Sequence, residues 1–376
     1  MAGDLVKPAS GMIYLDYQAT TPLAPEARAA MLPWLEGPEG IGFANPHSPH
    51  RPGRGAAAAV GVAREQVARL LPPGGRVVFT GSATEALNLA IFGSNAKTFA
   101  VSPIEHAAVL DSVRAHGGAC RMLPCGSDGL VPEDARIPAG TQLVAVMQVN
   151  NEIGTVQPVD TLAQASRAAG ALFLCDAVQG GGKLAPPAGA DLIALSAHKL
   201  YGPKGIGALW IRDGVEIAPI IHGGGQEQGL RSGTLSPALC AGFGAAAALA
   251  LERMVADAAH VEMLSRRALD ILSGWTLNGS ATQRWHGNLN VRRAKEHGGL
   301  DVARLMSDLR DIAFSAGSAC ASGSGRPSHV LSAIGLDERA AKSSVRLGFG
   351  RYTTLPELED ACARLEAAAA AQGVLL

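Results

Sequence analysis

The feature that most constrains this chain is the alternation of short apolar runs with segments of helical periodicity. Between the runs lie helical patterns such as Gly55–Leu71, which places apolar residues on one stripe before Pro72 and Pro73. Nearly continuous apolar runs fit strands covered on both faces, as in a parallel sheet. The alternation over residues 55–212 therefore predicts an α/β fold. The predicted strands are Val77–Thr80, Thr98–Ser102, Leu143–Val149, Ala171–Cys175, Asp191–Leu195 and Gly207–Ile211.

The chain is too long for one hydrophobic core. At 376 residues it exceeds the usual ceiling, so two domains are expected. The strand–helix pattern gives way to a long alanine-rich helix predicted at about Pro237 to Ile271, followed by a smaller unit that contains the strand-like NLNVRR. The expected division is a large domain at 17–255 and a small domain formed by 1–16 and 256–376, with a Ser/Gly-rich loop at about 315–326.

Charge and cysteine usage narrow the class of protein. The formal net charge of −1 argues against nucleic-acid binding and against a polybasic membrane patch. The first ten residues lack the apolar core of a signal peptide, and the apolar stretch from Ala241, about 11 residues, is too short to span a bilayer. The six cysteines show neither zinc spacing nor a disulfide framework. We expect a cytoplasmic protein without a metal site, acting on small substrates and protein partners.

A first candidate site lies in FTGSATEALNLAIFG, Phe79–Gly93, where a strand ends in a turn of small residues and a helix follows. Free N–H groups and the helix dipole at such a turn can bind an anion. Ala83 lies in this turn, and Thr84 can add a hydroxyl. The alternative is an ordinary helix N-cap with Glu85 in the first turn.

A second candidate is Asp176, which follows the apolar run in LFLCDAVQGGGK. Burying a carboxylate there costs free energy unless a cation pairs with it, and a protonated pyridine nitrogen is such a cation. Gln179 could reach a neighbouring oxygen of the same ring. A helix cap or a structural ion pair explains Asp176 equally well.

A third candidate is Lys199 in DLIALSAHKLYGPKGIG. A lysine at a strand end in a partly dry pocket has a lowered pKa and can form a Schiff base with an aldehyde. Ser196 and His198 could bind the same anion as Thr84. A solvated surface lysine is the alternative, and Lys204, flanked by proline and glycine, fits that description better.

The order of the three candidates indicates a cofactor. An anion site, then an aspartate, then a reactive lysine on one α/β unit match the needs of pyridoxal phosphate. Asp176 and Lys199 are 199 − 176 = 23 residues apart, which leaves room for one helix and a return strand.

The sequence resembles the NifS/IscS group of cysteine desulfurases, within the class V aminotransferase family of fold-type-I pyridoxal-phosphate enzymes. The resemblance runs nearly end to end and implies that family's fold, a mainly parallel seven-stranded sheet flanked by helices plus a smaller α+β C-terminal domain. The motifs that carry it are YLDYQATTP, NPHSPHRPG, FTGSATEALNLA, EHAAVLD, VNNEIGTVQP, DAVQGGGK, SAHKLYGPKGIG, HGGGQEQGLRSGT, SAGSACASGS and SSVRLGFGRYTT.

The resemblance implies a role for each matched residue of the cofactor site. Lys199 would hold pyridoxal phosphate covalently, and Asp176 would keep its ring nitrogen protonated. Gln179 would contact the ring hydroxyl, while His106 would stack on the ring and shuttle protons. The expected phosphate ligands are Ala83, Thr84, Ser196 and His198.

Other matched residues would serve the substrate or a second subunit. Arg346 would clamp the substrate carboxylate, with Asn45 nearby, and Asn151 would orient the cofactor or substrate. Thr234 would reach the phosphate of the neighbouring subunit, which implies a homodimer. The plainer alternatives are a capping role for His106, a turn at Asn151 and a surface ion pair for Arg346.

Cys320, in the small-residue run SAGSACASGSGRPS, decides which activity the resemblance implies. Its thiol would accept sulfur from L-cysteine as a persulfide, leaving L-alanine, and pass the sulfur to an acceptor protein such as an iron–sulfur scaffold. Cys175 ends an apolar strand and is expected to be buried and inert. No role is expected for the others, Cys120, Cys125, Cys240 and Cys362.

Two alternatives share most of these residues. Another class V aminotransferase or lyase, such as a selenocysteine lyase, would use the same cofactor residues, so only the Cys320 segment discriminates. An inactive sulfur-relay subunit is expected to lack Lys199 or Cys320, and this chain has both. Longer family members continue past LEAAAAAQGVLL into a tail that docks the scaffold, which puts that particular partnership in doubt.

Overall fold

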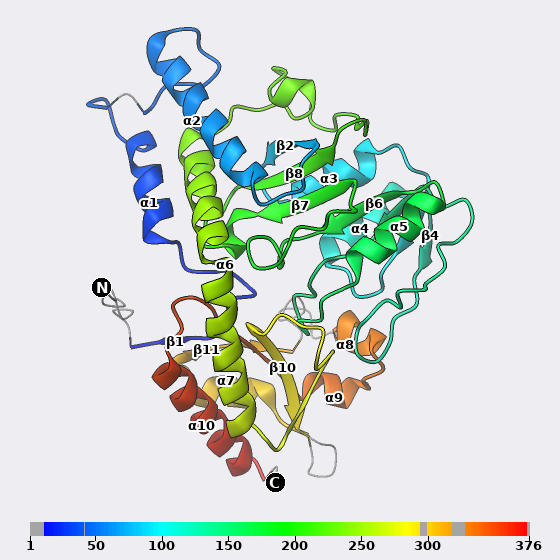
Figure 1. Cartoon of the computed structure of the whole chain (residues 1–376). Coiled ribbons are helices and arrows are strands. Elements are labelled where there is room, and N and C mark those ends of the chain that lie inside the picture. The colour runs from blue at the N-terminus through cyan, green and yellow to red at the C-terminus, as the bar shows by residue number, and fades with distance from the viewer. Residues whose placement is uncertain (1–10, 41, 294–298, 318–327, 374–376) are drawn as a thin grey trace.

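The larger lobe of the molecule is built on one seven-stranded sheet (Figure 1). The structure is a computed structural model that describes residues 11–40, 42–293, 299–317 and 328–373. All neighbouring strands of the sheet run parallel, except that β8 (Gly207–Arg212) is antiparallel to both of its neighbours. This architecture confirms the predicted fold class. The strand order is β2 (Gly75–Thr80), β8 (Gly207–Arg212), β7 (Leu192–Ser196), β6 (Leu172–Asp176), β5 (Leu143–Ala145), β3 (Thr98–Val101) and β4 (Ala119–Met122).

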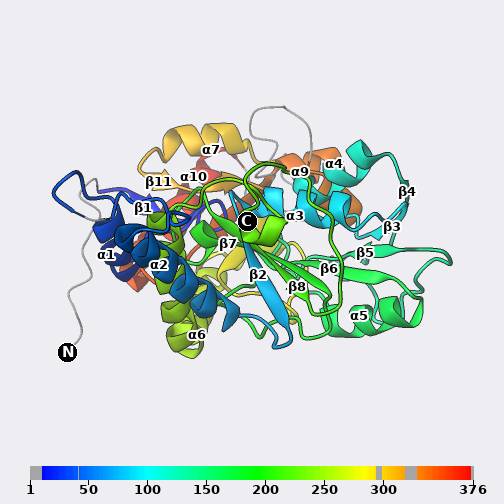
Figure 2. The ribbon, with the colours of Figure 1, turned by 90° about the horizontal axis from the view of Figure 1, so that it is seen from above.

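Helices cover both faces of this sheet because alternate strand residues are apolar on each side. Val78 and Leu209 pack with Leu87 in the core under helices α3 (Ala83–Gly93) and α4 (Ala107–His116), whereas Val77 packs with Phe243 in the core on the other face. Figure 2 shows α3 and α4 on one side of the sheet and α5 on the other. The covering helices are α2 (Arg51–Ala68), α3 (Ala83–Gly93), α4 (Ala107–His116), α5 (Val159–Ala168) and α6 (Pro237–Ile271).

The smaller lobe has its own sheet and its own core. Antiparallel strands β12 (Ser315–Ala316), β13 (Ser344–Gly348), β10 (Asn288–Arg293) and β9 (Trp275–Leu277) pack on helices through residues such as Leu289, Val345 and Leu365. The remaining helices of this lobe are α7 (Val302–Asp308), α8 (His329–Ala333), α9 (Glu338–Lys342) and α10 (Leu355–Ala371).

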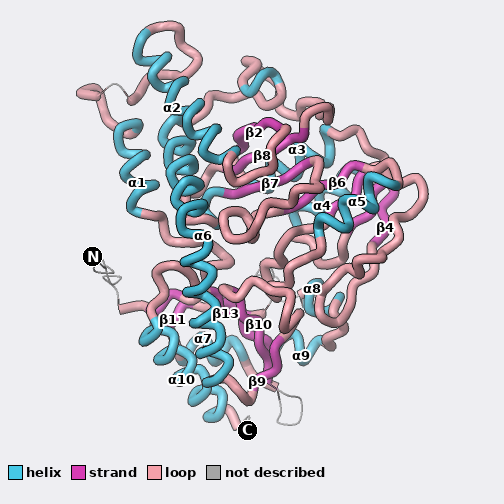
Figure 3. Tube along the Cα trace, in the orientation of Figure 1, coloured by secondary structure: helices cyan, strands magenta, loops and turns pink. Residues whose placement is uncertain are grey.

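The N-terminal segment joins the small lobe before it enters the large one. Strand β1 (Ile13–Tyr14) pairs in parallel with β11 (Ile312–Ala313). The chain then passes between the two sheets, in a region filled by the loops drawn pink in Figure 3. Helix α1 (Pro25–Met31) and the short 3-10 helix η1 (Leu32–Trp34) follow and pack against α6.

Helix α6 runs through both lobes. Phe243 belongs to the core of the large lobe and Leu264 to that of the small lobe. The helix passes without a break through residue 255, so the domain division proposed there remains a proposal. By length and composition alone α6 could cross a membrane, which corrects the expectation from the Ala241 stretch, but a helix shared by two cores meets the same criteria.

Several strand bounds differ from the predicted ones by one or two residues, and three local predictions differ more. Strand β4 was not predicted because all four of its residues are exposed at the sheet edge, which leaves no apolar run to detect. Strand β5 ends at Ala145 rather than Val149. Helix α2 starts four residues before Gly55, with His50 as its N-cap and a proline in the first turn.

Candidate active site

One cavity of about 470 Å³ lies between the two sheets and gathers most of the predicted site residues. It is formed at the carboxyl ends of β6 and β7, at the N-terminus of α3, and against β12 and β13 of the small lobe. In open α/β sheets, ligands bind at the carboxyl ends of the strands. The predicted residues that line it are Ala83, Thr84, His106, Asn151, Asp176, Gln179, Ser196, His198, Lys199 and Arg346.

The first turn of α3 forms one wall of this cavity. Ser82 is the N-cap, and its hydroxyl accepts a hydrogen bond from the Glu85 N–H, while Ala83 and Thr84 face the cavity. The N–H groups of a first helical turn have no partner within the helix, so they can bind an anion. The helix N-cap and the anion site were weighed as alternatives, but both can be present. Ser82 is the cap, which leaves Thr84 available to a ligand in the cavity.

Ser196, the last residue of β7, and His198, two residues later, line the same cavity as this turn. His198 Nδ1 lies 3.1 Å from the Thr20 hydroxyl. Burial, with a further contribution from the nearby Lys199 charge, lowers the pKa of His198 to about 4. The imidazole is therefore neutral at physiological pH and can act as a hydrogen-bond donor to an anion.

Asp176 is buried at the end of β6, with only 5% of its surface exposed. Its Oδ1 accepts a hydrogen bond of 2.9 Å from the Val178 N–H. Burial raises the pKa of Asp176, while the charges of His106 and Lys199 act in the opposite direction. A buried carboxylate in this position favours a cationic ligand atom in the cavity.

Gln179 has an unsatisfied polar atom in the same wall. Its Nε2 donates to the Gln18 carbonyl at 3.0 Å, but its Oε1 is buried and has no hydrogen-bond partner. Orphaned buried acceptors are rare, and one that lines a cavity points to a missing donor. Asp176 and Gln179 together fit a flat ring with a protonated nitrogen and a hydroxyl group.

Lys199 ends the 3-10 helix η2 (Ala197–Lys199) and lines the same cavity as Asp176 and Gln179. Its Nζ donates to the main-chain carbonyls of Gln18 and of Ala19, the latter at 2.8 Å. The rival lysine, Lys204, is exposed and does not line the cavity. Sequence reasoning assigned no role to the 18–19 carbonyls, because main-chain acceptors carry no residue signature.

His106 is both the N-cap of α4 and a cavity residue. Its Nδ1 accepts a hydrogen bond of 3.0 Å from the Ala108 N–H. Burial lowers the pKa of His106, and the Asp176 carboxylate partly offsets this effect. The neutral ring therefore carries its proton on Nε2, since Nδ1 serves as an acceptor. The capping role weighed for this residue holds, and it does not prevent contact with a ligand.

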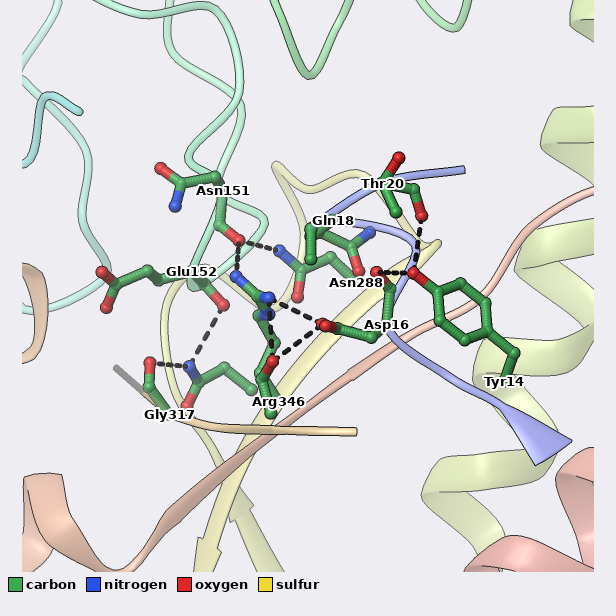
Figure 4. Close-up of polar contacts among 12 residues, drawn as sticks. Tyr14, Asp16, Gln18, Thr20, Asn151, Glu152, Asn288, Gly317 and Arg346 are labelled. Atoms are coloured by element: carbon green, nitrogen blue, oxygen red, sulfur yellow. Dashed lines mark hydrogen bonds and ion pairs between the residues drawn. The ribbon is translucent and has the colours of Figure 1, made fainter. Parts of the chain in front are cut away.

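Arg346 lies on β13 with 1% of its surface exposed, so it is not the surface ion-pair member weighed from sequence. Nη1 donates to the Asn151 carbonyl at 3.0 Å, and Nη2 contacts Asp16 Oδ1 at 2.8 Å and Ser315 Oγ at 3.3 Å (Figure 4). Asp16 belongs to YLDYQATTP but received no role from sequence. Arg346 thus sits at the cavity with one carboxylate already beside it.

Three predicted residues are not placed in this cavity. Asn45 is exposed in the loop before α2, where its Oδ1 accepts from the His47 N–H, and Thr234 is exposed at the end of HGGGQEQGLRSGT. Cys320 lies outside the described residues. The last described residue before it is Gly317. Ser315, two residues earlier, lines the cavity.

The other cysteines behave as the sequence predicts where the prediction concerned burial. Cys175 is fully buried in β6, and burial raises its pKa well above the ordinary value. Cys240 and Cys362 are buried in α6 and α10, whereas Cys120 is exposed on β4. A reactive thiol is therefore not found at Cys175.

Comparison with known proteins agrees with the observed fold. The family model for Aminotransferase class-V matches residues 13–360. Cysteine desulfurase IscS of Rickettsia bellii (strain OSU 85-389) is 41% identical over 370 residues, covering 92% of this chain and 88% of that protein. The mitochondrial cysteine desulfurase of Drosophila melanogaster is 42% identical, covering 92% of this chain and 78% of that protein.

Solved structures of related proteins superpose well on this chain. A NifS-like protein superposes with a TM-score of 0.84 at 30% identity, covering 97% of this chain and all of that one. A structure described as SspA in complex with cysteine gives 0.78 at 34% identity, covering 91% of this chain and all of that one. The α/β fold is thus that of a class V aminotransferase. The chain belongs to the Aminotransferase class-V family, in its NifS/IscS group, as the motifs predicted.

Proposed function

We propose that this protein is a cysteine desulfurase that binds pyridoxal phosphate, converts L-cysteine to L-alanine and retains the sulfur as a persulfide on Cys320. One observation carries the proposal: Lys199, Asp176 and Arg346 line a single cavity, and Ser315, five residues before Cys320 in the sequence, lines the same cavity. The proteins named as cysteine desulfurases that match over 92% of the chain support it.

The cavity fits pyridoxal phosphate on features of its own. The first turn of α3 with Thr84, Ser196 and His198 would hold the phosphate, and the buried Asp176 would hold the protonated ring nitrogen. The orphaned Gln179 Oε1 would accept from the ring hydroxyl. When bound, the cofactor supplies an electron sink for charge that develops on the substrate carbons.

The protein's own groups then divide the remaining work. Arg346 would bind the substrate carboxylate through its guanidinium fork, and the Lys199 amine and the neutral His106 would move protons at the substrate carbons. The Cys320 thiolate attacks the substrate Sγ, so an S–S bond forms as the Cβ–S bond breaks. The electron pair of the broken bond stays with the carbon and is finally protonated to give the alanine methyl group.

The test is a single turnover without reductant. Purified protein loaded with cofactor is mixed with L-cysteine, alanine is quantified, and the protein is weighed by mass spectrometry. We expect about one alanine per subunit and one added sulfur atom on the Cys320 peptide. Cys320→Ser should keep the cofactor absorbance and form neither product. Persulfide or sulfide formation at the parent rate in that variant would refute the assignment. Running selenocysteine beside cysteine distinguishes a selenocysteine lyase.

The partners of the reaction belong to the same proposal. We propose a homodimer in which Thr234 reaches the cofactor phosphate of the neighbouring subunit, consistent with its exposure and its absence from the cavity lining of its own chain. Asn45 is also exposed and absent from the cavity lining, and we propose that it lies near the substrate, as predicted from the sequence. The persulfide sulfur would pass to an acceptor protein in the cytoplasm. Sedimentation of the holoenzyme and cofactor affinity of Thr234→Ala test the dimer.

A further inference from the structure

Glu85 places a carboxylate beside the turn that would bind the cofactor phosphate. It is the third residue of α3, and its Oε2 accepts a hydrogen bond of 2.8 Å from the Gly81 N–H. Gly81 is followed directly by residues 82–84, which line the cavity. A carboxylate in the first turn of a helix is attracted to the positive end of the helix dipole, so it competes there with an anionic ligand. The anion site therefore needs a group that compensates the charge of Glu85.

Arg231 supplies the compensating charge from a distant part of the chain. Its Nε donates to Glu85 Oε1 at 2.6 Å and its Nη2 donates to Oε2 at 3.1 Å, so the guanidinium binds both carboxylate oxygens. Each of the two side chains is 19% exposed, which limits screening by solvent and salt. These hydrogen bonds raise the pKa of Arg231. The first turn of α3 thus carries a close, partly buried ion pair.

This ion pair lies against the turn itself. A Cβ built on Gly81 would be 2.9 Å from Glu85 Oε2 and 3.8 Å from Arg231 Nη2, so both charged groups pack on the Gly81 backbone. A larger residue at this position would push the carboxylate away from the N–H group that it accepts from. The two opposite charges therefore sit one residue before the part of the turn that lines the cavity.

The segment that carries Arg231 has a second anchor that does not involve Glu85. Glu227, four residues earlier, accepts from the Phe79 N–H at 2.8 Å. It also accepts two hydrogen bonds of 2.6 Å from Arg64, which compensates its charge and leaves Arg231 to Glu85. We therefore expect the segment to stay attached to β2 when the contact between Arg231 and Glu85 is removed.

We propose that Arg231 is a positioning residue for the anion site: by binding Glu85 it compensates that carboxylate and holds it on the Gly81 N–H, which lets the first turn of α3 accept a phosphate group. The inference rests on the proposed function, which makes this anion the phosphate of pyridoxal phosphate. Neither Arg231 nor Glu85 lines the cavity, so neither is assigned a contact with the ligand. Arg231 then favours phosphate binding only as long as Glu85 carries its charge.

The experiment is a double-substitution cycle on the full-length protein stripped of cofactor, with the dissociation constant of pyridoxal phosphate measured by absorbance. Arg231→Gln leaves Glu85 uncompensated and should raise this constant by about tenfold. Glu85→Gln removes the competing charge and keeps an oxygen for the Gly81 N–H, so it should bind at least as tightly as the parent. The double variant should return to within about twofold of the parent. Arg231→Lys, which keeps the charge, should stay within about threefold.

Two controls separate this charge effect from general damage to the large lobe. Pyridoxal lacks the phosphate, so it should bind to the parent and to Arg231→Gln equally well. Arg212 is matched to Arg231, because its partner Asp191, 3.2 Å away, also accepts from a main-chain N–H, that of Phe173 at 2.9 Å. Arg212 pairs with Gly75 at the start of β2, whereas the anion turn follows the end of that strand. Arg212→Gln should therefore keep the parent dissociation constant.

Several results would overturn the inference. Arg231→Gln could bind pyridoxal phosphate as tightly as the parent, or lose pyridoxal to the same extent. The double variant could stay as weak as Arg231→Gln, which would show that Arg231 does not act through Glu85. An equal loss in Arg212→Gln would show that removing any such ion pair weakens the site.

The affinities do not depend on sulfur transfer, so the inference and the proposed function can fail separately. A parent protein that binds pyridoxal phosphate but forms no persulfide refutes the proposed function, and the cycle still decides the role of Arg231. A parent that forms persulfide while all variants bind the cofactor equally refutes the inference alone. A parent that does not bind pyridoxal phosphate overturns both.

Discussion

Replacing Asp176 with asparagine should stabilise the cofactor-free protein while removing its activity. Asp176 is 5% exposed and accepts one hydrogen bond, from the Val178 N–H, which an asparagine oxygen can also accept. The substitution therefore keeps the shape and the contact but removes a buried carboxylate that lacks a full set of partners. Such a group costs about 1–3 kcal/mol, so Asp176→Asn should raise the free energy of unfolding by about that amount at pH 8.

The pH dependence gives the sign of the effect. Burial raises the pKa of Asp176 in the folded state, so the folded parent protein holds a proton more readily than the unfolded chain does. The destabilisation of the folded parent by the ionised Asp176 is complete at pH values above this raised pKa. It decreases as the pH falls below the raised pKa, because the carboxyl then becomes protonated in the folded state. The stability difference between Asp176→Asn and the parent should therefore be largest at pH 8 and shrink towards pH 4.

Urea unfolding of the cofactor-free proteins at several pH values measures this difference directly. The same variant should bind pyridoxal phosphate more weakly and show little turnover, because a neutral amide cannot hold the ring nitrogen protonated. An Asp176→Asn protein that is less stable than the parent at pH 8, or a difference that does not vary with pH, would show that the carboxylate is satisfied by the protein itself. The account of the cavity would then lose its main electrostatic argument.

Three further substitutions test other parts of the structure. Arg346→Lys should raise KM for cysteine by about tenfold with cofactor absorbance retained, because an ammonium group cannot replace the guanidinium fork; an unchanged KM would count against carboxylate binding there. Asp257→Ala leaves the buried Arg351, 2.7 Å away, without its partner and should lower unfolding free energy by about 3 kcal/mol in urea. Gly317→Ala places a Cβ 2.5 Å from that of Ser344 and should lower the free energy of unfolding by about 1–3 kcal/mol in the same assay. A urea midpoint equal to that of the parent would contradict the prediction for Asp257→Ala or for Gly317→Ala, whichever variant shows it.

Sequence reasoning succeeded where burial and apolar runs coincide. Six of the seven strands of the large sheet are continuous apolar segments, because they are covered on both faces, whereas β4 is an exposed edge and gave no signal. Helix α6 was predicted at its observed bounds, since its alanine-rich first half and its amphipathic second half each meet a core.

The site shows a different limit. Lys199, Asp176 and His106 could be found from side-chain chemistry and from motifs, and the structure brings them to one cavity. Asp16 could not, because its partner Arg346 is 330 residues away and nothing in the sequence links the two.

The continuity of α6 has a mechanical consequence. At 35 residues it is a rod of about 52 Å, and its hydrogen-bonded backbone crosses from one lobe to the other. A hinge between the lobes would have to break that rod, so large rotations of one lobe against the other are energetically disfavoured. Substrate admission and product exit must then rely on rearrangement of short connecting segments, and the two lobes should melt as a single cooperative unit.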